Sequence, residues 1–191
     1  MGSYMLVTRR MYMTLSSPKL AKEVRDFNLR NKEALEDTEP ARPNMYYTKR
    51  GCRQMLKLDY KDTMNGTEFR YYLTLKGEKK IIGTVCIGSV MFGSVKSGTI
   101  SYKMDKDYQG MGLCSEAVEE LINFCFNILK LHRIDSYVMP RNAKSLRIME
   151  KFGFEKEGLC KKCLEVNNKW EDHYIFGLIN DKISPVARYD Y

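Results

Sequence analysis

A short segment with two glycines separates a strand-like run from a long amphipathic helix pattern. It reads DYQGMGLCSEA over residues 107–117, and its glycines are Gly110 and Gly112. A glycine turn that leads into a helix can bind an anion, because the first amides of the helix have no partners within it and lie at the positive end of the helix dipole. Glycine also lets the main chain approach a phosphate without an intervening Cβ atom. The segment therefore predicts a phosphate site, with a plain tight turn as the alternative.

Two widespread phosphate motifs do not fit this segment. A P-loop would continue with Gly-Lys-Ser or Gly-Lys-Thr, and a dinucleotide fingerprint would need a third glycine and an acidic residue at the end of a second strand. The sequence has neither. If a phosphate binds here, another kind of loop holds it.

The cysteines predict neither a metal site nor a disulfide framework. The chain has six of them, and Cys160 and Cys163 form a C-x-x-C pair. A structural zinc site needs four ligands, and no second C-x-x-C or H-x-x-x-H accompanies this pair. We therefore expect no metal, and two thiols carried by a strand.

The composition is that of a globular protein with an excess of positive charge. Lys and Arg number 32 against 24 Asp and Glu, which gives a net charge of +8. The basic residues form no run of five, so a basic surface is favoured over a dedicated nucleic-acid site, with a ribosome-associated binding module as the alternative. No apolar run approaches the roughly 18 residues of a membrane span, and the first residues lack a secretory signal. We expect a cytoplasmic protein with no membrane partner.

The elements that would position the glycine segment alternate between helix and strand periods. Residues 1–15 suggest a first strand. The pair Ser17-Pro18 is suited to begin a helix, and its apolar positions recur at helical spacing until Pro40 ends it. Residues 46–66 then predict a short helix followed by a turn.

Strand periods dominate the rest of the chain, interrupted by two helices. The helix after the glycines has an apolar stripe of Ala117, Val118, Leu121, Ile122, Cys125, Ile128 and Leu129. We expect strands at 68–75 and 81–90 joined as a hairpin, a strand at 99–104, a strand at 133–139, a helix at 143–152 between Asn142 and Gly153, and strands at 163–166 and 170–179. This order predicts one α+β domain over residues 1–191 with a β-α-β unit at its centre.

Four stretches of the sequence carry a resemblance to one enzyme superfamily. QGMGLC resembles the acetyl-CoA pyrophosphate loop of the GNAT acyltransferases, Q/R-x-x-G-x-G/A, with Gln109 first and Gly112 fourth; Cys114 takes the sixth position in place of Gly or Ala. PRNAKSLRIMEKFGFEKEG (140–158) and NKWEDHYIF (168–176) are similar to signatures of the ribosomal-protein N-terminal acetyltransferase branch, and residues 16–35 resemble its first helix. The likeness spans most of the chain in the right order.

The resemblance implies a fold, a reaction and a set of donor-binding residues. The fold would be a GNAT-type mixed, mostly antiparallel central sheet flanked by helices, and the reaction direct transfer of acetyl from acetyl-CoA to an amine. The strand at 99–104 would run beside the pantetheine arm, and its splay from the strand at 133–139 would open a slot for the thioester. Main-chain amides near Tyr102, Lys103 and Met104 would polarise the acetyl carbonyl. The diphosphate cradle would consist of Gln109, Gly110, Met111, Gly112, Leu113, Cys114 and Ser115.

The same resemblance assigns roles at the start of the helix at 143–152. Asn142 would hold the pantetheine, and Ser145 would protonate the departing thiolate. The alternatives are a pure helix cap for Asn142 and a solvent-exposed hydroxyl for Ser145. Tyr102 could contact the substrate or the thiolate, or serve only as a core aromatic.

The general base stays unassigned, and this bears on the acceptor. Some relatives place a glutamate where this chain has Leu164, and alternation turns Glu165 to the opposite face. An α-amine with a pKa of ~8 is about one tenth neutral at pH 7, whereas a lysine amine at ~10.4 is almost fully charged. A site without an evident carboxylate base therefore favours a protein N-terminus, most simply the alanine or serine of a ribosomal protein.

Three readings remain open for the acceptor side. The enzyme could instead acetylate a small amine such as a polyamine, an antibiotic or an amino acid, or the chain could be a CoA-binding sensor without catalysis.

Tyr46 and Tyr47 could line an acceptor groove or act as apolar anchors, and Trp170 is expected to pack the last hairpin. The protein could be a monomer or a dimer.

Overall fold

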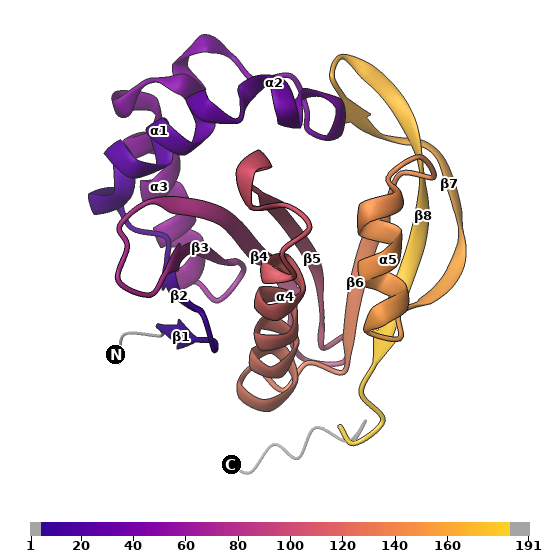
Figure 1. Ribbon diagram of the computed structural model, residues 1–191. Helices are drawn as coiled ribbons and strands as arrows, with labels where there is room; N and C mark the ends of the chain where they lie inside the picture. Colours follow the sequence, from indigo (N-terminus) through magenta and orange to yellow (C-terminus); the bar gives the residue numbers. More distant parts are fainter. Residues whose placement is uncertain (1–4, 184–191) are drawn as a thin grey trace.

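The computed structural model describes residues 5–183 (Figure 1). One sheet of eight strands runs through them in the order β1-β2-β3-β4-β5-β6-β8-β7. All neighbouring pairs are antiparallel except β5 with β6, which is parallel. The predicted α+β class with a mostly antiparallel sheet is confirmed. The strands are β1 (Leu6–Val7), β2 (Met11–Leu15), β3 (Phe69–Leu75), β4 (Ile81–Met91), β5 (Ser97–Met104), β6 (Arg133–Val138), β7 (Glu155–Val166) and β8 (Lys169–Ile179).

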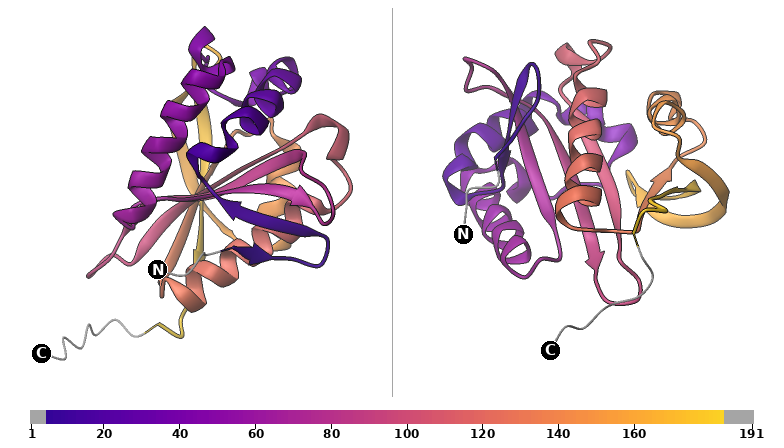
Figure 2. Two further views of the ribbon diagram at one scale, coloured as in Figure 1. Left: turned by 90° about the vertical axis from the view of Figure 1, so that its left-hand side faces the viewer. Right: turned by 90° about the horizontal axis from the view of Figure 1, so that it is seen from below.

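Helices cover both faces of this sheet (Figure 2). The longer ones are α1 (Ala21–Arg30), α3 (Lys49–Met64), α4 (Leu113–Asn123) and α5 (Ala143–Lys151), and α2 (Lys32–Leu35) adds one turn after α1. Four short 3₁₀ helices join them: η1 (Pro18–Leu20), η2 (Glu36–Thr38), η3 (Asn44–Tyr47) and η4 (Lys106–Tyr108). A π-helical turn, η5 (Phe124–Ile128), continues α4.

Two adjacent tyrosines of β3 show how the layers are built. Successive strand residues point to opposite faces of a sheet. Tyr71 lies in the larger core cluster, where its ring meets Phe124 at the end of α4, whereas Tyr72 lies in the smaller cluster formed with α1 and α3. The helices α1 and α3 therefore cover one face, and α4 and α5 cover the other.

The N-terminal part of the chain departs from the sequence predictions in three places. One helix was expected between Ser17 and Pro40, but η1, α1, α2 and η2 share this stretch. Residues 1–15 were expected to form one strand, but Leu6–Val7 and Met11–Leu15 are two strands that pair with each other across a tight connection; residues 1–4 lie outside the described range. The helix predicted within residues 46–66 is not short, since α3 has 16 residues. Thr48 begins it by accepting a hydrogen bond from the Gly51 amide, at 3.0 Å.

The C-terminal part contains three further differences. The strand expected at 163–166 is the last third of β7, whose register shifts near Gly158 and Cys163 interrupt the alternation that identifies a strand. Ile128 was placed in the apolar stripe, but the π turn changes the helical phase and leaves it 59% exposed. Trp170 was expected to pack the last hairpin and is instead 63% exposed.

Within residues 5–183, no helix combines the length and the apolar character that crossing a membrane requires.

Candidate active site

The parallel strands β5 and β6 separate after a short paired stretch. Only Ser97, Gly98 and Thr99 pair with β6. Beyond them the strands diverge, and the residues 100–104 and 136–138 form opposite walls of a cavity of about 570 Å³. The predicted splay of these strands is therefore present, and it opens a slot directly beside Tyr102.

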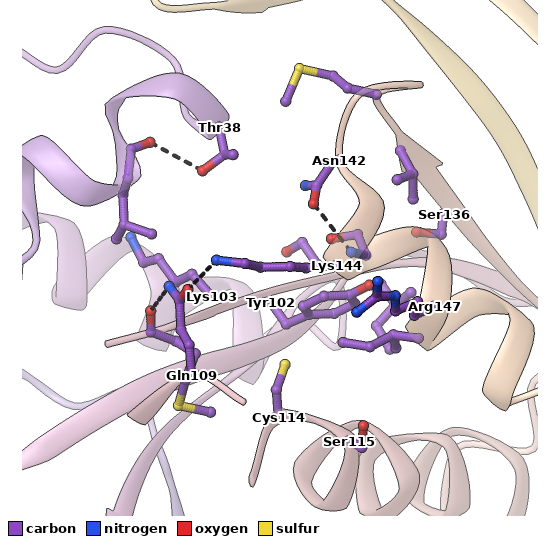
Figure 3. A pocket seen from close by; sticks show the side chains of 18 of the residues that line it. Thr38, Tyr102, Lys103, Gln109, Cys114, Ser115, Ser136, Asn142, Lys144 and Arg147 are labelled. Carbon is purple, nitrogen blue, oxygen red and sulfur yellow. Dashed lines mark hydrogen bonds between the residues drawn. The ribbon is translucent and has the colours of Figure 1, made fainter. Parts of the chain in front are cut away.

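The cavity gathers nearly all the residues that the sequence singled out. Met111 is the exception, because its side chain is 54% exposed and lies outside the cavity wall. The lining residues that were predicted are Tyr102, Lys103, Met104, Gln109, Gly110, Gly112, Leu113, Cys114, Ser115, Asn142 and Ser145. Figure 3 shows several of them around Tyr102, with Cys114 and Ser115 on α4 and Asn142 at the start of α5.

The two glycines of the loop both adopt a left-handed conformation. Gly110 has φ 76° and Gly112 has φ 74°, which residues with a Cβ atom rarely adopt. Gly112 is the N-cap of α4, and the first helical hydrogen bond runs from the Glu116 amide to its carbonyl, at 3.1 Å. The amides of residues 113–115 accordingly have no partner within the helix. This arrangement presents unpaired donors at the positive end of a helix, which is a site for an anion.

An arginine from the first hairpin holds this loop from outside the cavity. The Arg10 guanidinium contacts the Glu116 carboxylate at 2.7 Å and donates to the Met111 carbonyl at 3.0 Å. The Arg10 amide also donates to Glu116, at 2.7 Å. Burial would raise the pKa of Glu116, but its hydrogen bonds and the charge of Arg10 hold that pKa below its usual value. Nothing in the local sequence indicated these contacts of Arg10 with Glu116 and Met111.

A second charged pair fixes the turn that precedes the loop. The Asp105 side chain is fully buried, receives Arg30 at 2.6 Å and accepts a hydrogen bond from the Asp107 amide at 3.1 Å. Asn31 accepts from the Lys106 amide at 2.9 Å. Burial would raise the pKa of Asp105, but these hydrogen bonds and the Arg30 charge keep it below its usual value. The turn is thereby tied to α1.

Three polar groups and one thiol face each other in the middle of the cavity. The Asn142 side chain caps α5 by accepting from the Ser145 amide at 3.1 Å, as predicted, and both residues also line the cavity. Burial raises the pKa of Tyr102, and an interaction with the nearby Ser145 side chain offsets part of this rise. The Tyr102 hydroxyl is buried, and no group among the described residues stands in hydrogen-bonding geometry to it. Burial raises the pKa of Cys114 to about 12, which keeps it a neutral thiol.

Positive side chains on α5 were missed at the sequence level. Lys144, Arg147 and Lys151 all line the cavity. Their spacing of three and four residues is that of one helix face, so the sequence did contain the signal. The Lys144 ammonium also donates to Gln109 at 2.6 Å, and Gln109 donates to the Met104 carbonyl at 3.3 Å. The Gln109 side chain is thus engaged in holding the loop against β5 and α5.

A second, smaller cavity adjoins the first one. Its volume is about 140 Å³, and Leu35, Glu39 and Lys103 line both cavities. Tyr46 and Tyr47 line the smaller one, which agrees with the groove alternative for these two residues. The other lining residues are Asn28, Asn31, Lys32, Glu36, Pro40, Ala41, Arg42, Asn167 and Asn168. The small cavity is therefore walled by α1, the segment after α2 and the turn between β7 and β8.

The sequence left the general base unassigned, and the structure places one carboxylate and one imidazole in the wall of the large cavity. Leu164 and Glu165 are exposed and line neither cavity. Among the lining residues of the large cavity that the structure describes, Glu39 is the sole carboxylate, and the buried His173 of β8 is the sole imidazole. No group of three or more His, Cys, Asp or Glu within residues 5–183 could hold a metal ion.

Comparisons with known proteins point in one direction. A family model described as "Acetyltransferase (GNAT) domain" matches residues 14–155. The chain is 34% identical over 151 residues to the "Probable N-acetyltransferase YjcK" of Bacillus subtilis, covering 78% of this chain and 83% of that protein. It is 29% identical over 180 residues to the "[Ribosomal protein uS5]-alanine N-acetyltransferase" of Escherichia coli, covering 94% and 93%. The crystal structure of a ribosomal-protein-S5-alanine acetyltransferase from Vibrio fischeri has a TM-score of 0.90 and 32% identity, covering 95% and 99%.

Proposed function

The chain belongs to the GNAT acetyltransferase family and takes its acetyl group from acetyl-CoA, and from this premise we propose that its acceptor is the α-amine of a protein N-terminus, in the first place that of a ribosomal protein. The observation that carries the proposal is the pair of adjoining cavities, one suited to a long anionic donor and one suited to a short segment of peptide. The acceptor class follows that of the Escherichia coli relative, which acts on an N-terminal alanine according to its name. Such an acceptor is consistent with a cytoplasmic enzyme.

The donor half of the site follows from the unpaired amides and the nearby cations. The amides of Leu113, Cys114 and Ser115 would hold the diphosphate, and Lys144 and Arg147 would add positive charge beside it. The separated part of β5 and β6 would enclose the pantetheine arm, with Asn142 close to it. In this arrangement the thioester lies near Tyr102 and Ser145.

The chemistry requires few groups from the protein. The neutral acceptor amine attacks the thioester carbonyl carbon, the C–S bond breaks, and the nitrogen loses a proton to solvent. Ser145 would donate a proton to the departing thiolate and regain one from solvent, and main-chain amides of β5 would stabilise the oxyanion. Tyr102, whose hydroxyl has no other partner within the described chain, would contact the reacting atoms.

The charge of the small cavity separates the peptide hypothesis from the polyamine hypothesis. Glu36 and Glu39 contribute two negative charges, whereas Lys32, Arg42 and Lys103 contribute three positive ones. A polyamine would bring several positive charges into a cavity that is already positive, which Coulomb repulsion disfavours. A peptide brings one charge at its N-terminus and otherwise neutral main-chain groups.

Turnover with defined acceptors tests the proposal. Release of CoA from acetyl-CoA should be measured with peptides that begin with Ala or Ser, with spermidine and with free amino acids. We expect peptide turnover to exceed that of the small amines, and Ser145→Ala to lower kcat. Mass spectrometry of ribosomal proteins from cells with and without the chain would identify the natural acceptor. CoA binding without turnover of any amine would instead support a sensor.

A further inference from the structure

One carboxylate lies where the two cavities meet. Glu39 follows η2 and lines both cavities, and its side chain is 18% exposed. The other charged residues that line the large cavity, within the described part of the chain, are the cations Lys103, Lys144, Arg147 and Lys151. A positively charged ligand group entering this cavity therefore has a single anionic partner available.

The structure holds Glu39 firmly in this position. Its carbonyl accepts a hydrogen bond from the Asn167 amide in the turn between β7 and β8, at 3.0 Å. Its Oε1 atom lies 2.8 Å from the Lys103 ammonium. Lys103 is itself fixed, because it donates to the Tyr46 hydroxyl at 2.9 Å and lies over the rings of Phe27 and Tyr46 at 5.8 and 5.7 Å. Two elements distant in sequence from Glu39 thus set the position of its main chain and of one carboxylate oxygen.

The second carboxylate oxygen retains accepting capacity. Oε2 forms an ion pair with Arg42, whose Nη2 atom lies 3.6 Å away, a distance longer than a hydrogen bond. Arg42 also lies over the Tyr46 ring, at 4.9 Å, so its guanidinium contacts the ring as well as the carboxylate. An ionised carboxylate can accept about four hydrogen bonds, so Oε2 can receive a further donor while Oε1 stays with Lys103.

We propose that Glu39 is the specificity-determining residue that binds the α-ammonium group of the acceptor, through Oε2, at the junction of the two cavities. The proposal rests on the proposed function and adds a residue to it. Glu39 binds the acceptor in its charged form and favours that form, so the bound ammonium must lose one proton to water before its nitrogen can attack the thioester. Glu39 is thus needed to bind and orient the acceptor, and it does not have to accept the proton that the ammonium loses.

The first experiment compares acceptor and donor kinetics in matched variants. Glu39→Gln keeps the shape of the side chain and removes its charge. Glu33→Gln makes the same change on an exposed residue of α2 that lines neither cavity. We expect Glu39→Gln to raise KM for an Ala-initiated peptide by roughly 10- to 100-fold, the range of one hydrogen bond to a charged group. KM for acetyl-CoA should change less than about twofold, and Glu33→Gln should match the wild type in both.

A second measurement separates recognition of the ammonium from general damage. Binding of the Ala-initiated peptide and of its des-amino analogue should be measured by calorimetry in the presence of CoA. The wild type should prefer the amine, and Glu39→Gln should bind both equally, while Glu39→Asp, which keeps the charge, should retain part of the preference. CoA affinity in the same titrations reports whether each variant is folded.

The outcomes distinguish this proposal from the one on which it rests. If the wild type acetylates peptides and Glu39→Gln has the same peptide KM and the same preference for the amine, the role of Glu39 is wrong and the proposed function stands. If the wild type acetylates no peptide, the proposed function is wrong and the role of Glu39 falls with it. If Glu39→Gln loses affinity for CoA as well as for peptide, Glu39 supports the fold and does not select the acceptor.

Discussion

Replacing Gly112 by alanine tests whether the backbone conformation of the loop creates the anion site. Gly112 has φ 74° and ψ 0°, in the left-handed region. An added Cβ atom would have Arg10 Nη2 as its nearest neighbour, at 3.5 Å, which is an ordinary contact. The substitution therefore introduces no steric clash, and its effect comes from the conformation alone.

The magnitude follows from the cost of that conformation. A residue with a Cβ atom in the left-handed region costs about 1–2 kcal/mol, and the lower entropy of the unfolded alanine chain returns about 0.4–1 kcal/mol. The net loss of at most about 1.6 kcal/mol lowers the melting temperature of a protein of this size by up to about 6 °C. If the free loop relaxes to avoid the strain, the amides of residues 113–115 turn away from the donor. Restoring them on binding then costs up to the whole strain of about 1–2 kcal/mol, because the unfolded chain takes no part in this equilibrium, and CoA affinity weakens by up to about 5- to 25-fold.

Gly77 provides the matched control for this experiment. It has φ 85°, lies in the turn between β3 and β4, and has open space around an added Cβ atom. Gly77→Ala should lower the melting temperature by a similar amount and leave CoA binding unchanged. Both quantities can be measured by differential scanning and isothermal titration calorimetry. Gly112→Ala with the CoA affinity of the wild type would show that the left-handed conformation does not orient the amides, and would refute the reasoning.

Three further predictions concern residues around the cavity. Tyr102→Phe removes a buried hydroxyl that lacks a partner in the described chain, so thermal stability should stay the same or rise. The kcat value should fall by roughly 10- to 100-fold. Lower stability with unchanged kcat would instead assign the hydroxyl a structural role. Arg10→Lys keeps the charge but loses the planar guanidinium that contacts Glu116 and Met111, so KM for acetyl-CoA should rise severalfold with little change in kcat. The matched control Arg9→Lys, on an exposed neighbour, should have no effect on either constant. The pKa of Asp105 is lower in the folded state than in the unfolded chain, so the stability it contributes is present above about pH 4 and is lost as pH falls through the folded-state pKa. Thermal scans between pH 7 and pH 3 should show that loss in the wild type and a smaller one in Asp105→Asn, and equal pH profiles would contradict it.

The parts of the fold that were predicted correctly depend on local rules. The hairpin of β3 and β4, the strand β5 and the cap of α5 by Asn142 each follow from alternation or from a capping side chain within a few residues. The exposed edge strand β7 was largely missed because its register shifts and its charged residues mask the alternation. The π turn after α4 was missed because one extra residue per turn changes which side chains face the core.

The candidate site also has parts that local sequence patterns predict and a part that they do not. The glycine loop, Tyr102 and Ser145 could be identified from short motifs and from the family resemblance, and the cations of α5 were available from their spacing. Glu39 could not be identified, because its importance depends on where Asn167 and Lys103 lie in three dimensions. No local pattern in the segment after α2 marks it as a residue that faces a cavity.

The proposed anion site depends on tertiary structure, although a local motif predicts it. Glycines permit the left-handed turns at residues 110 and 112, but they also make the unfolded loop flexible and do not select one conformation. Selection comes from two charged contacts that flank the loop, Arg30 with Asp105 before it and Arg10 with Glu116 after it. These pairs join residues 75 and 106 positions apart in the sequence. The first amides of α4 are therefore held in a geometry for binding only when the N-terminal hairpin and α1 have packed against the sheet.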